Sequence, residues 1–329
     1  MPDSTSPSPR RRRWFVATYI AFLVMVAAAV LRLVRVEADV WDYYYPELRS
    51  SGAVSAPTSR DDGKLDVLTL GGSVLLQIES ALENRLRGEL GDRVRYYHLS
   101  TTAHTSRDSL LKYQQLSQQK FDVVILCHGI NDVRMNYWPQ ADFQDDYTHC
   151  PWYASLQRDS SGGQLTLWNR LTDFASQEGL GPPPPGKYPL GRDLKTAAAF
   201  ESNLQQLASA SVHRDDRVVI LTMAHYLPEN YTREAFRDGQ LDYGIGDVKY
   251  AAELWGKPDQ VAAGITEHNR RTRAVSQQHE NVQLVDLEQQ IESSGRNFSD
   301  ICHLTRIGQQ RVVDVVAPIV VRMVDEGRR

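Results

Sequence analysis

Short apolar runs alternate with amphipathic stretches along most of the chain. The runs rich in Val, Leu and Ile predict five β-strands, at 65–70, 94–99, 122–127, 217–223 and 282–287. Apolar residues at helical spacing lie between and after these runs, and they predict helices at 75–90, 106–119, 196–211, 260–279 and 305–324. Because strands that alternate with helices form parallel sheets, the pattern predicts an α/β fold. We expect a three-layer α/β/α sandwich with about five parallel strands.

Two stretches, at about 138–195 and 228–258, interrupt this regular pattern as irregular insertions. The first contains Gly162-Gly163 and four prolines at 182–185, and a short helix is expected around 167–176. Long irregular segments in compact domains often form lids or binding walls, but others are simple excursions on the surface. The sequence leaves both interpretations open.

The N-terminal segment has the pattern of a membrane signal. Residues 1–13 are rich in Ser and Pro, end in the block Arg10–Arg13, and are expected to form a disordered, basic cytoplasmic tail. Residues 14–34 are apolar, and no charge occurs among them before Arg32. This segment is long enough to form a transmembrane signal-anchor helix. A cleaved signal peptide is the alternative, although Val36-Glu37-Ala38 is a poor cleavage site. We therefore expect a single-pass membrane protein with a stalk at 35–63. Its domain, at 64–329, would lie outside the cytoplasm, in the periplasm if the source is bacterial.

Composition and charge exclude several classes of protein. The formal net charge is −4 and charges of both signs are mixed, so no basic face beyond the N-terminus indicates nucleic acid as a partner. The three cysteines, Cys127, Cys150 and Cys302, show neither the spacing of a disulfide framework nor that of a metal site. We expect no metal and no organic cofactor, and the sequence indicates no particular protein partner.

Residues suited to acyl-transfer chemistry lie next to the predicted strands. Ser73 directly follows the first strand, and Asp300 and His303 precede the last helix, three residues apart. A serine hydroxyl is a weak nucleophile at neutral pH unless an imidazole takes its proton and a carboxylate orients that imidazole. Functional loops of open α/β sheets gather beyond the carboxyl ends of the strands, so we expect these three side chains to meet there.

Four sequence blocks, in this order, resemble those of the SGNH (GDSL-type) hydrolase superfamily. They are Gly71-Gly72-Ser73, Ser100-Thr101-Thr102-Ala103, Gly129-Ile130-Asn131-Asp132 and Asp300-Ile301-Cys302-His303, within about 64–324. The resemblance implies a flavodoxin-like SGNH hydrolase fold in which Ser73 attacks an acyl carbonyl, His303 removes the serine proton and Asp300 orients His303. It also implies an oxyanion hole formed by the backbone N–H groups of Ser73 and Ala103 and by the side-chain amide of Asn131.

Two positions depart from the pattern of the superfamily. Gly72 stands where the family often has Asp, and a glycine there keeps a tight turn feasible. Ala103 stands where the family usually has Gly, so its methyl group narrows the pocket, or strains the backbone if φ is positive. Neither residue is asked to make or break a bond, so we expect the chemistry to survive both departures.

Further residues near the strand ends are weaker candidates. The candidates for the substrate pocket are Gly72, His104, Gly129 and His225, although a histidine in such a place, His128 included, is more often structural. Asp286, at the end of the fifth strand, is the rival carboxylate for His303, and Cys302 is the rival nucleophile.

The sequence therefore predicts a membrane-anchored serine esterase that lies outside the cytoplasm. Its substrate would be an acyl ester of a glycan or a lipid, cleaved through an acyl-serine intermediate. One alternative is an SGNH-type O-acyltransferase that passes the acyl group to a polysaccharide. Another is a noncatalytic binding module that retains the fold, for which the departures at Gly72 and Ala103 are the support.

Overall fold

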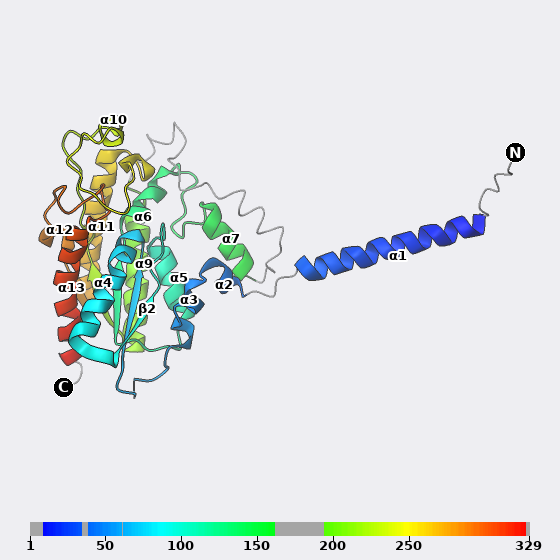
Figure 1. The fold of residues 1–329 in the computed structure, drawn as a ribbon, viewed down its shortest axis with the longest axis horizontal. Helices are drawn as coiled ribbons and strands as arrows, with labels where there is room; N and C mark the ends of the chain where they lie inside the picture. The colour runs from blue at the N-terminus through cyan, green and yellow to red at the C-terminus, as the bar shows by residue number, and fades with distance from the viewer. Residues whose placement is uncertain (1–8, 35–38, 61, 162–193, 327–329) are drawn as a thin grey trace.

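A computed structural model describes residues 9–34, 39–60, 62–161 and 194–326 (Figure 1). The short helix expected around 167–176 lies outside these residues. The strands are β1 (Leu65–Gly71), β2 (Val94–His98), β3 (Val123–Cys127), β4 (Arg217–Leu221) and β5 (Val282–Val285). The α-helices are α1 (Pro9–Val34), α2 (Val40–Tyr44), α3 (Glu47–Ser50), α4 (Ser73–Leu90), α5 (Ser106–Gln115), α6 (Ile130–Arg134), α7 (Pro151–Ser160), α9 (Thr196–Arg214), α10 (Arg233–Arg237), α11 (Pro258–Gln278), α12 (Leu287–Gln290) and α13 (Arg306–Glu326).

The five strands form one parallel sheet in the order β2-β1-β3-β4-β5, as the sequence predicts. In the central pairing, Val67 of β1 lies opposite Val123 of β3, and Val123 lies opposite Arg217 of β4. This order is that of flavodoxin-like sheets, in which the chain reverses direction along the sheet between β1 and β3. All residues of β1 and β3 are buried, which explains why these strands read as continuous apolar runs.

Alternate residues of the central strands face two separate apolar clusters. Val67 and Ile125 contact the cluster that includes the inner faces of α4 and α13. Leu68 and Leu126 contact the cluster that includes α5 and α9. Because each strand is covered on both sides, the fold is the three-layer α/β/α sandwich that the sequence predicts.

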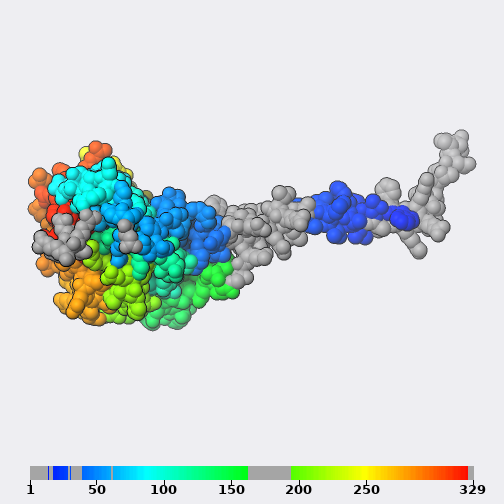
Figure 2. Space-filling view, turned by 90° about the horizontal axis from the view of Figure 1, so that it is seen from below, coloured from blue at the N-terminus to red at the C-terminus, as the bar shows by residue number. Residues whose placement is uncertain are grey.

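The segment 40–56 is part of the domain, although its sequence pattern predicts a stalk. It forms α2, α3 and the 3-10 helix η1 (Ala53–Ser55), and Tyr45 and Ala53 are fully buried. Leu48 is also buried and joins the cluster under α5 and α9. In Figure 2 the atoms of this segment, in blue, lie against the body of the domain. The expected stalk at 35–63 is therefore wrong for 40–56, because apolar burial ties these residues to the core.

The helix expected at 14–34 is present as α1, but α1 already begins at Pro9. The disorder expected for 1–13 is therefore wrong for 9–13, where the chain is helical. Among the helices of the described residues, however, none combines the length and the apolar character that crossing a bilayer requires. The prediction that this helix spans a membrane therefore has no support from the structure.

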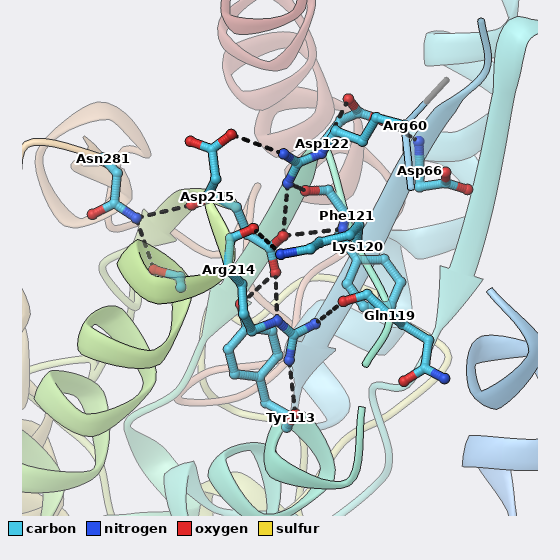
Figure 3. A network of polar contacts seen from close by, with 12 residues as sticks. Arg60, Asp66, Tyr113, Gln119, Lys120, Phe121, Asp122, Arg214, Asp215 and Asn281 are labelled. Atoms are coloured by element: carbon cyan, nitrogen blue, oxygen red, sulfur yellow. Dashed lines mark hydrogen bonds and ion pairs between the residues drawn. The ribbon is translucent and has the colours of Figure 1, made fainter. Parts of the chain in front are cut away.

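A network of charged side chains joins the amino ends of β3 and β4 (Figure 3). Arg60 donates to the carboxylate of Asp216 at 2.8 Å and to the carbonyl oxygen of Phe121 at 2.7 Å. Arg214 pairs with the other carboxylate oxygen of Asp216 at 3.0 Å. Asp216 is fully buried, and it accepts hydrogen bonds from Arg60, the Tyr113 hydroxyl and the Phe121 N–H, while Arg214 adds an ion pair. The network fixes the edge of the sheet that holds the amino ends of the strands. The candidate site lies at the opposite edge, at the carboxyl ends.

Candidate active site

Folding brings Ser73, His303 and Asp300 together at the carboxyl edge of the sheet. The Ser73 Oγ lies 2.9 Å from the His303 Nε2, and the His303 Nδ1 lies 2.7 Å from the Asp300 Oδ2. Ser73 is the first residue of α4, directly after β1, so its backbone N–H has no partner inside the helix. The hydroxyl thus faces an imidazole whose far nitrogen is bonded to a carboxylate, an arrangement that can move a proton away from oxygen.

The loop that carries the carboxylate and the imidazole is held rigidly. Asp300 Oδ1 accepts hydrogen bonds from the backbone N–H groups of Cys302 and His303, at 2.9 and 2.7 Å. Asp300 Oδ2 accepts a further bond from the backbone N–H of Tyr250 at 2.8 Å. Asp300 and His303 are almost completely buried. Several donors around one buried carboxylate fix its orientation.

Asn131, from α6, is oriented by both ends of its side-chain amide. Its Nδ2 donates to the carbonyl oxygen of His104 at 2.9 Å, and its Oδ1 accepts from the indole nitrogen of Trp255 at 3.3 Å. An amide nitrogen carries two hydrogens, so the bond to His104 leaves one for a substrate oxygen. A Cβ atom on Gly72 would lie 2.7 Å from the Asn131 Nδ2, closer than side chains approach one another.

Gly72 is therefore required for a different reason from the one expected. A glycine here is expected to keep a tight turn feasible, but the φ of Gly72 is −93°, which any residue adopts. The structure shows that a side chain at this position would displace the Asn131 amide. The glycine makes room for an oxyanion-hole candidate.

Ala103 has a φ of +66°, so it lies in the left-handed region that glycine favours. A hydrogen bond of 3.3 Å from the His104 N–H to the Thr101 carbonyl oxygen closes the turn around it. For a residue with a Cβ this conformation costs about 1–2 kcal/mol. Of the two consequences expected for the methyl group at this position, the structure shows the backbone strain.

The histidines expected near the site have different surroundings. His104 lies beside Tyr45, with ring centroids 5.6 Å apart and 11% of its side chain exposed, and its extensive desolvation lowers its pKa to about 4. His128 bonds to the hydroxyl of Ser109 at 2.6 Å, and burial lowers its pKa to about 3. His225 lines a surface groove of about 790 Å³ whose lining residues include none of the three residues Ser73, His303 and Asp300. His128 thus has a structural partner, whereas the substrate-pocket role predicted for His104 and His225 stays a prediction.

The structure also shows the surroundings of Gly129 and Asp286. Gly129 packs against Met223, to which a Cβ would lie within 3.3 Å. Asp286 pairs with Arg273 at 2.8 Å, and this partner holds its pKa below the usual range. The rival carboxylate is therefore committed elsewhere, and Asp300 is the partner of His303.

Cys302 lies beside the acid and the base but is poorly suited to chemistry. Its Sγ is 3.7 Å from the His303 Nδ1, and ligand atoms of Asp300, Cys302 and His303 all lie within 4.8 Å of one another. Burial raises the pKa of this thiol well above its usual value. A thiol that keeps its proton is neither a good nucleophile nor a good metal ligand. The hydrogen bonds of Asp300 and His303 fit an acid–base pair better than a metal centre.

Two aromatic residues that the sequence analysis did not single out flank the imidazole. The rings of Tyr250 and Trp255 lie 5.8 and 5.9 Å from that of His303. Both come from the irregular stretch 228–258, which carries no periodic signal, and Trp255 is buried. The concentration of aromatic residues in this stretch is the one feature of the sequence that could have indicated them.

The comparison with protein families agrees with this arrangement. A model of the GDSL-like lipase/acylhydrolase family matches residues 76–311, which contain Asn131, Asp300 and His303 and begin just after Ser73. A GDSL-like lipase from Bacteroides thetaiotaomicron is 12% identical over 85% of this chain and 98% of its own, with a TM-score of 0.46. An acetylxylan esterase from Geobacillus stearothermophilus is 13% identical over 78% of this chain and 95% of its own, with a TM-score of 0.45. No curated protein gives a significant match to the sequence.

A hydroxyl, an imidazole and a carboxylate in series, at the carboxyl edge of a parallel sheet, define a serine hydrolase. More particularly, the chain belongs to the GDSL-like lipase/acylhydrolase family, since the family model covers well over half of its length. The protein is accordingly an enzyme that acts on ester bonds.

Proposed function

We propose that the protein is a membrane-anchored, extracytoplasmic esterase that hydrolyses acyl esters through an acyl-serine intermediate. The observation that carries the catalytic part is the hydrogen bond of 2.9 Å between the Ser73 Oγ and the His303 Nε2. A serine in this contact can lose its proton as it attacks, which an isolated serine hydroxyl at neutral pH does not do.

In the first half-reaction, Ser73 attacks the acyl carbon and His303 takes the hydroxyl proton at Nε2. Asp300 stabilises the resulting imidazolium through its contact of 2.7 Å with the His303 Nδ1. His303 then gives the proton to the leaving alcohol, and the acyl group remains on Ser73. In the second half-reaction, His303 removes a proton from water as the water oxygen attacks the acyl-serine. His303 then gives this proton to the Ser73 Oγ as the acyl–oxygen bond breaks, so the carboxylic acid departs and the free serine is restored.

The negative oxygen of each tetrahedral intermediate requires donors that are already in place. The backbone N–H of Ser73 lies in the first turn of α4, where it has no partner within the helix and where the helix dipole favours negative charge. The second N–H of the Asn131 amide and the backbone N–H of Ala103 complete the proposed oxyanion hole. Each such donor lowers the barrier by about 2.7–4 kcal/mol in related acyl-transfer sites.

The location and the substrate class rest on the N-terminal segment. Its block of four arginines precedes an apolar run, and such a charge stays on the cytoplasmic side of a membrane. The described apolar side chains of α1, Trp14 and Phe22 among them, are exposed rather than packed in a core. The domain would then face acylated glycans or lipids outside the cytoplasm.

An ester panel of rising chain length on the purified full chain tests the chemistry. We expect hydrolysis of activated short esters and labelling by a fluorophosphonate probe, and neither activity in Ser73→Ala. Absence of both in folded wild-type protein would contradict the esterase and favour a binding module. Rapid transfer to an added glycan, without appreciable hydrolysis, would instead indicate an acyltransferase.

Fractionation of cells tests the anchor. We expect the full chain to stay in the membrane fraction after an alkaline wash, and a chain that lacks residues 1–34 to leave that fraction. Equal recovery of both chains in the wash would show that residues 14–34 do not anchor the protein.

A further inference from the structure

The segment 40–56 lies before the part of the chain that the family model matches, yet it contacts the loop between β2 and α5. This loop, residues 99–105, carries Ala103. In Figure 1 the helices α2 and α3, in blue, lie beside α5 and α7. The contact involves residues outside the matched region, and it is made by side chains.

Glu47, the first residue of α3, is at the centre of the contact. Its carboxylate lies 2.6 Å from the Lys112 Nζ and accepts a hydrogen bond of 3.1 Å from the hydroxyl of Thr101. Lys112 is fully buried, and its Nζ also donates to the Leu99 carbonyl oxygen at 2.6 Å and to the Thr101 hydroxyl at 3.3 Å. Glu47 thus neutralises the buried ammonium group of Lys112. Together, Glu47 and Lys112 hold the loop 99–105 at Leu99 and at Thr101.

The point held by Glu47 is close to the reacting serine. The Thr101 N–H donates to the Gly71 carbonyl oxygen at 3.0 Å, two residues before Ser73. The Thr101 carbonyl accepts the bond that closes the strained turn at Ala103. A backbone in an unfavourable conformation persists only where its surroundings over-determine it. The segment 40–56 contacts this turn through the hydrogen bond between the Thr101 hydroxyl and the Glu47 carboxylate.

A second contact from the same segment supports the other end of the loop. Tyr45 donates through its hydroxyl to the Asp108 Oδ1 at 2.9 Å, and the Asp108 Oδ2 accepts from the Thr105 N–H at 2.8 Å. The Lys112 ammonium lies 5.5 Å from the centre of the Tyr45 ring. The loop is therefore held between Thr101 and Thr105 by residues that precede the matched region.

We propose that Glu47 is a positioning residue for catalysis, which holds the turn at Thr101–Ala103 so that the Ala103 N–H serves the oxyanion hole. The inference rests on the proposed esterase function. Glu47 does not touch the substrate; it acts through Thr101 and Lys112. The segment 40–56 would then contribute to catalysis by supporting the active-site loop 99–105.

Three variants of the full chain test this role. Glu47→Ala removes both the charge and the acceptor, and Glu47→Gln keeps an oxygen for the Thr101 hydroxyl. Arg49→Ala is the matched control, because Arg49 lies on the same helix and pairs at 2.6 Å with Asp42 while its side chain is 71% exposed. We expect kcat for an activated ester to fall about 10- to 100-fold in Glu47→Ala, since a small misplacement of catalytic groups has this effect. Glu47→Gln should be intermediate, and Arg49→Ala should match the wild type.

Two readouts separate positioning from general damage. The KM should stay within about threefold of the wild-type value, because the lost interaction belongs to the transition state. Hydrogen exchange of the loop 99–105 should be faster in both Glu47 variants than in Arg49→Ala. The double variant Glu47→Gln/Lys112→Met removes both charges together, so it should fold even if Glu47→Ala does not, yet retain a low kcat.

The outcomes distinguish this inference from the proposed function. Turnover that depends on Ser73 in the wild type, combined with a wild-type kcat in Glu47→Ala, would overturn the role of Glu47 and leave the esterase in place. A fall in kcat no larger than the fall in the folded fraction would overturn it as well. If the wild type shows no turnover that depends on Ser73, the esterase itself fails, and the exchange of the loop still reports whether Glu47 holds it.

Discussion

Replacement of Gly72 by alanine should disable the enzyme through Asn131. The new Cβ would lie 2.7 Å from the Asn131 Nδ2 and 3.2 Å from the His104 carbonyl oxygen. Ordinary contacts between such atoms are about 3.5–4.0 Å, so the amide has to move by roughly 1 Å. The movement breaks its bond of 2.9 Å to His104 and withdraws its free N–H from the substrate oxygen.

The magnitude follows from the loss of one oxyanion donor. We expect kcat to fall about 100- to 1000-fold, which corresponds to about 2.7–4 kcal/mol of barrier. The free energy of unfolding should fall by about 1–3 kcal/mol, the usual cost of extra volume in a packed region. Gly72→Asp, which introduces the residue that the family often has here, should be at least as harmful. Steady-state kinetics with an activated ester and urea unfolding measure both effects.

A double-mutant cycle with Asn131→Ala provides the control. In that background the obstructing amide is absent, so Gly72→Ala should change kcat by less than about threefold, and the two effects should not add. Multiplicative effects of the two substitutions, or a folded Gly72→Ala variant with wild-type kcat, would refute the argument that this glycine makes room for the amide.

Three further outcomes are expected. Asp300→Asn should lower kcat about 10⁴-fold in ester hydrolysis, because the imidazole of His303 loses the carboxylate that orients it, and a loss below about tenfold would speak against the relay. Ala103→Gly should raise the midpoint of urea unfolding. The substitution relieves the strain of the left-handed φ, and this gain is larger, by up to about 1 kcal/mol, than the entropic cost of a glycine in the unfolded chain. A lower midpoint would contradict this account. Burial raises the pKa of Asp132 from 3.8 to about 7, so the folded state holds a proton that the unfolded state has released between these values. The free energy of unfolding should therefore fall as pH rises through that window, by roughly 4 kcal/mol at most, and Asp132→Asn should flatten this slope in urea titrations; an unchanged slope would count against it.

The parts of the fold that local pattern encodes were predicted well. Each strand is a short apolar run, and the observed strands lie within the predicted ranges except that β1 extends to Gly71. The elements of the triad could be found because Ser73, Asp300 and His303 occur in short blocks at strand or helix ends. The geometry that joins them followed from the parallel sheet, in which the carboxyl ends share one edge.

The segment 40–56 could not be predicted because long-range partners fix it. Its helices are too short to show a period, and α3 spans only Glu47–Ser50. Its place depends on the pairing of Glu47 with Lys112 and on the bond of Tyr45 to Asp108, residues more than 60 positions away. Tyr250 and Trp255 escaped prediction for the same reason, since only folding brings them to His303.

The burial of Lys112 limits how the protein can be shortened. A fragment trimmed to the boundaries suggested by the family match would begin at about residue 76, and one trimmed to the first strand at about 64. Either cut removes the counter-charge of an ammonium group that water cannot reach, and an uncompensated buried charge is strongly destabilising. A shortened version intended for crystallisation or for engineering should therefore start no later than Asp39, whose side chain caps α2.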